Sequence, residues 1–274
     1  MYSEKVIFVL IAVIAIASAF KLKPQFRIAN GWNARKADAP YIVSIQLNNP
    51  YYPHFCGGSI INENWILTAG HCLKDKVISD IKIHAGRYDL KVSEEGDQLR
   101  SIDYYKIHEL YAGGPTPNDI ALIYTAKPFV WTKFVKPISL PEKDAIPKGI
   151  AELFGWGLIY STGQGKVKFP DVLQTATLPL TSFGECKKYF GSAIDETNVC
   201  TESTSKGMTA CSSDSGGPLT QKNSKNENVV IGIVSWGKMM CGQPNDKSVY
   251  VRVSAFIDWI KETQENFELN GAKE

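Results

Sequence analysis

The stretch Cys211-Ser212-Ser213-Asp214-Ser215-Gly216-Gly217-Pro218 decides the fold of this 274-residue chain. A serine that follows an acidic residue and precedes two glycines and a proline predicts a sharp turn, which holds one hydroxyl out of a packed core. Most serines beside glycines are ordinary turn residues. The motif therefore gains meaning only from matching residues elsewhere in the chain.

Two such matches occur earlier in the sequence. The stretch 68–72 places His71 beside a cysteine, and the stretch 118–122 places Asp119 at the head of an apolar strand. A serine needs a base to become a nucleophile at neutral pH, and that base needs a third group to fix its tautomer. His71, Asp119 and Ser215 therefore form a candidate catalytic set for acyl transfer.

The three motifs, in the chain order His, Asp, Ser, resemble the trypsin/chymotrypsin family of serine proteases. The resemblance runs from Ile28 to about Phe267. It implies that His71 is the general base, that Asp119 orients it and that Ser215 is the nucleophile. Ser235, in Ser235-Trp236-Gly237, matches the family serine that supports the buried aspartate.

Short apolar or alternating runs separated by Gly, Pro, Asn and Asp predict an all-β fold. These runs occupy 41–47, 59–61, 65–68, 81–85 and 120–123, and then 151–157, 173–180, 229–236 and 249–253. The proline-rich segment 127–141 reads as the crossover between two halves. From Ser254 to Phe267 the apolar spacing becomes helical, with Ser254 as the expected cap.

The resemblance implies two antiparallel six-stranded β-barrels with a C-terminal α-helix. The expected domain organisation is a first barrel over 28–136, which carries His71 and Asp119, and a second barrel with the helix over 137–274, which carries Ser215. Together they make one peptidase domain over 28–267.

Residues 1–19 have the pattern of a secretory signal peptide. Lys5 precedes an apolar run, and Ala17-Ser18-Ala19 is a small-residue cleavage site. The alternative is a membrane helix, but the run of about 15 apolar residues is shorter than the roughly 20 that a bilayer requires.

Residues 20–27 are expected to form an activation propeptide. In the family an activating protease cuts before an Ile-Val-Gly-Gly sequence, and here the equivalent is Ile28-Ala29-Asn30-Gly31 after Arg27. The new ammonium of Ile28 would pair with Asp214, which is otherwise a costly buried carboxylate. The uncut chain is therefore expected to be nearly inactive, with a trypsin-like protease as its activator.

The whole chain has 30 basic and 28 acidic residues, a net charge of +2. Without residues 1–27 it has 26 basic and 27 acidic residues, a net charge of −1. Most of the basic character lies in the precursor segment, so neither nucleic acid nor an anionic membrane is expected as a partner.

Six cysteines in a secreted chain permit fifteen pairings, which sequence alone does not resolve. The resemblance implies Cys56–Cys72, Cys186–Cys200 and Cys211–Cys241. A metal site is the alternative, but the chain has no Cys-x-x-Cys pair. An oxidising compartment is expected.

The resemblance makes the backbone N–H groups of Ser213 and Ser215 the oxyanion-hole donors. The family almost always has glycine where this chain has Ser213. A Cβ restricts the required backbone conformation, which would cost on the order of 1–3 kcal/mol if held. Loss of one donor would instead lower turnover roughly 10²–10³-fold. A working enzyme, slow or resistant to inhibitors, is expected.

The floor of the primary specificity pocket should be Thr209, where trypsin-like members carry aspartate. Gly237 leaves the pocket entrance open and Ser248, where glycine is common, narrows the interior. Ser235 and Trp236 are also expected among the substrate-binding residues. This pocket predicts cleavage after uncharged side chains of medium to large size, such as Leu, Met, Phe or Tyr. Asp246 is expected on the outer loop, away from this pocket.

The other histidines, His54, His84 and His108, match no motif and are interpreted as structural. Some family members bind calcium in the loop that here begins near Arg87, where a carboxylate ligand would be expected. A solvated acidic loop with Asp89, Glu94, Glu95 and Asp97 is therefore predicted. Neither a metal nor a cofactor is expected.

The sequence is thus interpreted as a secreted serine endopeptidase made as a zymogen. Its three disulfides resemble invertebrate digestive members of the family, which suggests the gut lumen. Expected partners are protein or peptide substrates, an activating protease and protein protease inhibitors. The alternative is a catalytically impaired homologue that acts as a binding or lectin-like protein, because of Ser213. A specialised regulatory protease is less favoured, since extra modules would be expected.

Overall fold

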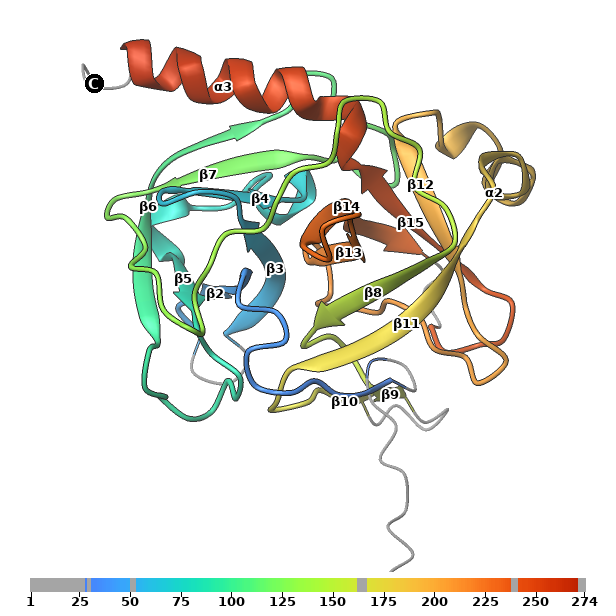
Figure 1. Ribbon diagram of the computed structural model, residues 1–274, viewed down its shortest axis with the longest axis horizontal. Helices are drawn as coiled ribbons and strands as arrows, with labels where there is room; N and C mark the ends of the chain where they lie inside the picture. Colours follow the sequence, from blue (N-terminus) through green and yellow to red (C-terminus); the bar gives the residue numbers. More distant parts are fainter. Residues whose placement is uncertain (1–27, 29–30, 50–52, 162–166, 238–240, 271–274) are drawn as a thin grey trace, which may run out of the picture.

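The computed structural model describes residues 28, 31–49, 53–161, 167–237 and 241–270. Two β-barrels lie side by side, and the C-terminal helix α3 runs along the outside of the first barrel (Figure 1). This arrangement confirms the predicted pair of barrels with a terminal helix. The expected signal peptide and propeptide, residues 1–27, lie outside the described residues.

The first barrel is closed by six antiparallel strands in the order β2-β3-β4-β7-β6-β5. In β5, Ile81, Ile83 and Ala85 face the interior and are fully buried, as the alternating sequence predicts. The strands and the short 3₁₀ turns of this half are β2 (Ile42–Leu47), β3 (His54–Ile60), β4 (Trp65–Thr68), η1 (Gly70–Cys72), η2 (Ile78–Asp80), β5 (Ile81–Ala85), β6 (Gln98–Ile107) and β7 (Ala121–Thr125).

The second barrel is closed by the pairing of β8 with β11, and β1 (Trp32–Asn33) pairs with β11 outside this closed ring of six strands. Two bulges, between Leu219 and Thr220 and between Val234 and Trp236, interrupt the register of β14 with its neighbours. The strands are β8 (Ile150–Gly155), β11 (Gln174–Thr181), β12 (Asn198–Glu202), β13 (Pro218–Lys222), β14 (Asn228–Gly237) and β15 (Lys247–Arg252), with the small hairpin β9 (Tyr160–Ser161) and β10 (Val167–Lys168) beside them.

The two ends of the chain each associate with the opposite half. Strand β1 (Trp32–Asn33) pairs with β11 of the second barrel, although it precedes the first barrel in sequence. At the other end, Phe267 of α3 (Ile257–Asn270) packs against Trp65 and Tyr104 of the first barrel, at ring-centroid distances of 5.4 and 4.8 Å. The barrels are therefore joined by more than their crossover.

The structure corrects the expected start of the C-terminal helix. A 3₁₀ turn, η4 (Val253–Phe256), precedes α3, and the hydroxyl of Ser254 caps neither. It instead donates to the carbonyl of Ala145 at 2.6 Å and accepts a hydrogen bond from Arg252. A second helix, α2 (Phe183–Phe190), and the 3₁₀ turn η3 (Gly191–Ala193) were not expected from the sequence.

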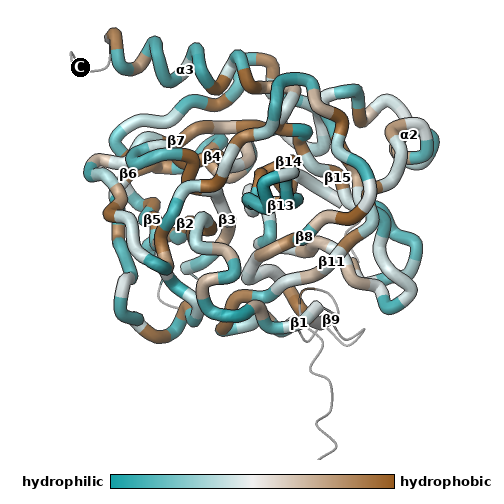
Figure 2. The backbone as a smooth tube through the Cα atoms, viewed as in Figure 1, coloured by the Kyte–Doolittle hydropathy of each residue, from teal (hydrophilic) through white to brown (hydrophobic). Residues whose placement is uncertain are grey.

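Apolar residues of both barrels meet in the largest of three core clusters that the described residues form, and a second cluster fills the interior of the second barrel. First-barrel residues such as Ile45 and Leu67 belong to the same cluster as Phe154 and Ile233 of the second barrel. Figure 2 shows that hydrophobic residues fall mainly in the strands, whereas the outer loops are largely hydrophilic. Among the described helices, none has both the length and the apolar character needed to cross a membrane.

Candidate active site

His71 lies in the η1 turn that follows β4, and Cys72 anchors this turn to β3 through a disulfide to Cys56. The turn brings the histidine onto the buried carboxylate of Asp119. Oδ2 of Asp119 lies 2.7 Å from Nδ1 of His71, and Oδ1 accepts the backbone N–H of the same residue at 2.8 Å. Because a carboxylate only accepts, Nδ1 carries the proton and Nε2 is left as the basic nitrogen.

Asp119 has almost no contact with solvent, with an exposed fraction of 1%. Asn118 before it adopts a left-handed conformation (φ 63°), which turns the chain into β7. Asp119 accepts a third hydrogen bond, from the hydroxyl of Ser235 to Oδ2 at 2.6 Å. Burial and the charge of Asp119 raise the pKa of the neighbouring Tyr111 phenol, so the Tyr111 hydroxyl stays protonated and donates to the carbonyl of Gly114. The Asp119 carboxylate is thus buried, and the three hydrogen bonds it accepts come from His71 and Ser235.

The serine loop is fixed to both barrels by its backbone. The carbonyl of Ser215 accepts from the N–H of Gly57 in β3 at 2.7 Å, and the N–H of Gly216 donates to Val234 in β14 at 2.8 Å. Gly216 has φ 76°, and a Cβ there would lie 2.3 Å from Oγ1 of Thr68 and 3.2 Å from Sγ of Cys72. Only glycine fits this approach, which sets Ser215 beside the loop of His71.

The backbone at Ser213 has φ 71°, the left-handed conformation that glycine adopts without strain. Its carbonyl lies 3.0 Å from Nε2 of His54, and Nδ1 of that ring lies 2.8 Å from the hydroxyl of Ser44. Within the described residues, no acceptor is recorded for the N–H groups of Ser213 and Ser215. They are available as a pair of donors, as an oxyanion hole requires.

His54 is therefore a site residue that the sequence interpretation missed. Burial, which includes packing against Trp156, lowers the pKa of His54 to about 4, although donation to the Ser213 carbonyl opposes this shift. The ring is neutral at physiological pH, and its Nε2–H must be the donor to the carbonyl. Its sequence neighbours give no signal of this contact, which spans 159 positions.

Asp214 directly precedes Ser215 and has an exposed fraction of 1%. Its carboxylate accepts the N–H groups of Gly157 and Cys211 at 2.8 and 2.9 Å. Burial raises the pKa of Asp214 from 3.8 to about 7, because these two neutral donors compensate the loss of water only in part. A cation brought to this carboxylate would therefore be strongly favoured.

Ile28 is fully buried in a core cluster inside the second barrel, together with Leu153 and Ala210. Ala210 lies four positions before Asp214, so the Ile28 side chain lies in the core that supports the serine loop. Arg27, the expected cut site, lies outside the described residues. A Cβ on Gly155 or Gly157 would come within 2.1 to 2.3 Å of Asp214, so both glycines leave the space that this carboxylate fills.

The predicted specificity-pocket residues Thr209 and Ser248 do meet. Their hydroxyl oxygens are 2.7 Å apart, and their exposed fractions are 2% and 5%. Trp236 packs edge-on against Phe190 of α2 at 4.8 Å, and a Cβ on Gly237 would lie 3.5 Å from the hydroxyl of Ser248. At the predicted pocket floor the two hydroxyls are therefore paired, and neither Thr209 nor Ser248 carries a charge.

Asp246 belongs to a neighbouring loop and is buried rather than solvated. Its Oδ1 accepts from the hydroxyl of Tyr189 at 3.3 Å, and its carbonyl accepts the N–H of Ser203. These contacts direct it toward α2. No recorded contact joins it to Thr209 within the described part of the chain.

The acidic loop after β5 is more ordered than a solvated loop would be. Arg87 donates to Oδ2 of Asp97 at 2.6 Å and to the carbonyl of Leu90, so its guanidinium lies among the acidic side chains. Glu94 pairs with Lys36 at 2.9 Å and accepts the N–H of Tyr88. The prediction that these carboxylates are simply solvated is therefore wrong for Asp97 and Glu94.

The structure contains the three disulfides that the family resemblance implied: Cys56–Cys72, Cys186–Cys200 and Cys211–Cys241. Cys56, His71 and Cys72 lie close enough to suggest a metal cluster. Both sulfurs are consumed in a disulfide, so they lack the thiolate that a metal needs.

Two six-stranded barrels with a histidine–aspartate pair from one and a serine loop from the other define a chymotrypsin-like serine protease fold. Comparison with known proteins agrees. A sequence profile of the Trypsin family matches residues 28–260. The chain therefore belongs to the trypsin family of serine proteases.

Individual relatives span most of its length. Lectizyme of Glossina austeni is 38% identical over an alignment of 256 positions, which covers 89% of each chain. Anionic trypsin of Bos taurus is 34% identical and covers 93% of this chain and 96% of its own. Serine proteinase stubble of Drosophila melanogaster is 35% identical over 88% of this chain, which is 31% of its own length.

Proposed function

We propose that the chain is the precursor of a secreted serine endopeptidase that cleaves after uncharged residues of medium to large size. The observation that carries the proposal is the buried Asp119 carboxylate, which binds both His71 and Ser235 beside the Ser215 loop. A carboxylate with 1% exposure and three donors is arranged to stabilise a positive charge on His71.

The proposed reaction is acyl transfer. Nε2 of His71 takes the hydroxyl proton of Ser215 as its oxygen attacks the peptide carbonyl. The same nitrogen then returns the proton to the leaving amine, and Asp119 stabilises the imidazolium in between. Water repeats the sequence on the acyl-enzyme, which releases the new carboxylate and restores Ser215.

The oxyanion of the tetrahedral intermediate would bind the N–H groups of Ser213 and Ser215. The left-handed φ of 71° at Ser213 keeps the backbone that a glycine would have, at a cost on the order of 1–3 kcal/mol. His54 supports this conformation through the carbonyl of the same residue. We therefore propose that both donors serve catalysis.

Substrate preference is proposed to follow from the pocket floor. Thr209 carries no charge and its hydroxyl is already paired with Ser248, so a substrate Lys or Arg would find no counter-ion there. Leu, Met, Phe or Tyr would bury apolar surface without leaving a buried charge. Trp236 and Gly237 would form the wall and the open mouth of the pocket.

Activation is proposed to occur by cleavage after Arg27. The new ammonium of Ile28 would reach Asp214, whose pKa of about 7 reflects a carboxylate without a full counter-charge. Three disulfides fit an extracellular chain. A digestive role, protein substrates, a trypsin-like activator and protein protease inhibitors as partners are part of this proposal.

The test is hydrolysis by the purified precursor before and after treatment with trypsin. The substrates are short peptides ending in Phe, Leu, Ala or Arg, and Ser215→Ala is the control. Activity on Phe and Leu that requires cleavage at Arg27, and that is absent from the control, is expected. Activity confined to Arg would refute the proposed specificity.

A second candidate function is binding without catalysis. It is motivated by Ser213, which stands where a glycine would be unstrained. A fully cleaved chain that hydrolyses none of the four peptides, although it is folded, would replace the protease proposal with this one.

A further inference from the structure

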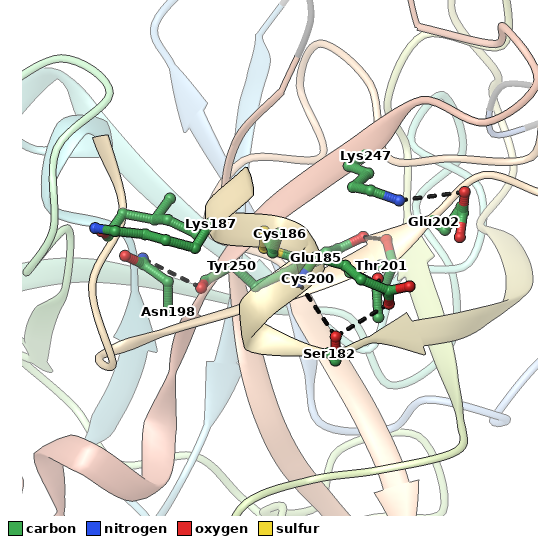
Figure 3. The surroundings of a disulfide bond; sticks show 12 residues. Ser182, Glu185, Cys186, Lys187, Asn198, Cys200, Thr201, Glu202, Lys247 and Tyr250 are labelled. Carbon is green, nitrogen blue, oxygen red and sulfur yellow. Dashed lines mark hydrogen bonds and ion pairs between the residues drawn. A yellow bond between two sulfur atoms is a disulfide. The ribbon is translucent and has the colours of Figure 1, made fainter. Parts of the chain in front are cut away.

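A pocket of about 430 Å³ opens on the second barrel between the loop 146–149, the end of β11 and the start of α2. Apart from the disulfide Cys186–Cys200 in its wall, it contains none of the candidate site residues. Figure 3 shows the surroundings of this disulfide, where α2 packs over β12. The volume is within the range of pockets that hold small ligands.

The wall of this pocket is largely apolar. Ile146, Leu180, Phe183 and Val199 line it, and the exposed fractions of Ile146 and Phe183 are 64% and 40%. Large apolar side chains so exposed around one hollow are typical of a binding site.

The polar side chains of the wall are mostly occupied within the protein. Thr181 donates to the carboxylate of Glu185, and Asn198 accepts from the N–H of Asp195. Ser182 also donates to Glu185, and Asn198 donates to the carbonyl of Tyr250 (Figure 3). These groups offer little to a ligand that is rich in amides.

Arg252 is the exception. It lines the pocket and has an exposed fraction of only 8%. Nε donates to the carbonyl of Glu196 at 2.8 Å and Nη1 to the hydroxyl of Ser254 at 2.7 Å. Both acceptors are neutral. Within the described residues no carboxylate pairs with this guanidinium, and Nη2 has no recorded acceptor.

A buried cation with only neutral partners lacks the counter-charge that buried charges normally have. A guanidinium binds a carboxylate through two parallel N–H bonds, and Arg252 has free N–H groups for such a contact. Lys148 and Glu196, both exposed in the same wall, carry opposite charges, so with Arg252 the wall keeps a net positive charge.

We propose that this pocket binds an apolar monocarboxylate of the fatty-acid type. The carboxylate would pair with Arg252, and the acyl chain would lie against Ile146, Leu180 and Phe183. The occupied polar groups favour an acyl chain over a peptide, whose amides would lack partners. The site does not depend on the proposed protease activity.

The test is calorimetric titration of the uncut full chain with decanoate, with decanol as the neutral counterpart. Saturable binding of one decanoate is expected, with decanol at least about tenfold weaker because it has no charge for the guanidinium. Equal binding of the two ligands, or no saturable binding of decanoate, would overturn the proposal.

A matched pair of variants locates the binding. Ile146 and Ile150 have the same exposed fraction, 64%, but only Ile146 lines the pocket. Ile146→Ser should weaken decanoate binding on the order of fivefold, whereas Ile150→Ser should leave it unchanged. Equal effects of the two variants would place the ligand elsewhere and refute the site.

N-acetyl-leucine separates a fatty acid from a peptide carboxylate. It carries the same charge but replaces the long chain by an amide and one short side chain. Binding weaker than that of decanoate supports the proposal. Tighter binding than decanoate would overturn the lipid assignment.

Discussion

The hydroxyl of Ser235 donates to Oδ2 of Asp119 at 2.6 Å, and this bond joins β14 of the second barrel to the head of β7 in the first. The same oxygen binds Nδ1 of His71. The position of the histidine therefore depends on the docking of the two barrels, because one partner of its carboxylate comes from each side.

Ser235→Ala tests this positioning role. A hydrogen bond to a charged group contributes about 1.5–3 kcal/mol, so kcat should fall between about tenfold and a hundredfold. KM should change much less, because the hydroxyl contacts Asp119 and not the substrate. Asp119→Asn, which removes the carboxylate itself, should cost about 10⁴ in kcat. A Ser235→Ala enzyme with unchanged kcat would show that the contact is only structural.

Ser213→Gly tests the backbone strain at the proposed oxyanion donor. Glycine adopts φ 71° freely, so the free energy of unfolding should rise by up to about 1 kcal/mol, after the larger entropy of an unfolded glycine is subtracted. Turnover should stay equal or rise, since the N–H keeps its direction. Asn226→Gly, at φ 63° in a distant turn, is the control and should stabilise less, because asparagine tolerates this conformation well. A fall in turnover would mean that the Ser213 side chain itself takes part.

Ser248→Gly tests the depth of the specificity pocket. Removing the hydroxymethyl group that lies 2.7 Å from Thr209 should lengthen the interior. The ratio of kcat/KM for Phe to that for Leu should rise on the order of tenfold, the effect that a change of one or two methylenes usually has. An unchanged ratio would mean that the pocket floor lies elsewhere.

Asp214 predicts a pH dependence of stability in the uncut chain. Its pKa is raised in the fold from 3.8 to about 7, so the folded state binds the proton more tightly than the unfolded state. The stability that this proton provides is present below pH 4 and is lost as the pH rises to about 7, by up to roughly 4 kcal/mol.

The measurement is the difference in unfolding free energy between the uncut chain and its Asp214→Asn variant, from pH 4 to 8. His54, whose lowered pKa gives the opposite trend below pH 6.5, is present in both and cancels. In the uncut chain this difference in unfolding free energy should change with pH across the window. After cleavage at Arg27 it should become nearly independent of pH, because the Ile28 ammonium would offset the negative charge of Asp214. A slope that is unaffected by cleavage would argue against the proposed ion pair.

The sequence predicts the fold where its signals are local. Alternating runs such as 81–85 become strands, Asp119 contacts His71, and Gly216, next to Ser215, lies against Thr68 and Cys72 of the histidine loop. Strand β6 was not predicted. None of its residues is fully buried, so its sequence lacks the continuous or alternating apolar pattern that marks the other strands. Helix α2 had an available signal in Ser182 and Glu185, which form a capping box, since the Ser182 hydroxyl accepts the N–H of Glu185.

Long-range contacts explain most of the remaining differences. Ser254 has the residue type of a cap, but its hydroxyl is held by Ala145, 109 positions away. His54 reads as an isolated histidine until the fold sets it against the Ser213 carbonyl. The sequence shows that Arg87 lies near several acidic residues. Its pairing with Asp97 depends on the conformation of the loop between them.

The exchange of chain ends between the barrels has a consequence for the order in which the protein is synthesised. Strand β1 leaves the ribosome first, yet its partner β11 is made some 140 residues later. The first barrel also needs Phe267 of α3, which is made later still, to cover Trp65, Tyr104 and Tyr124. The final packing of both barrels therefore requires that the chain has been synthesised through Phe267.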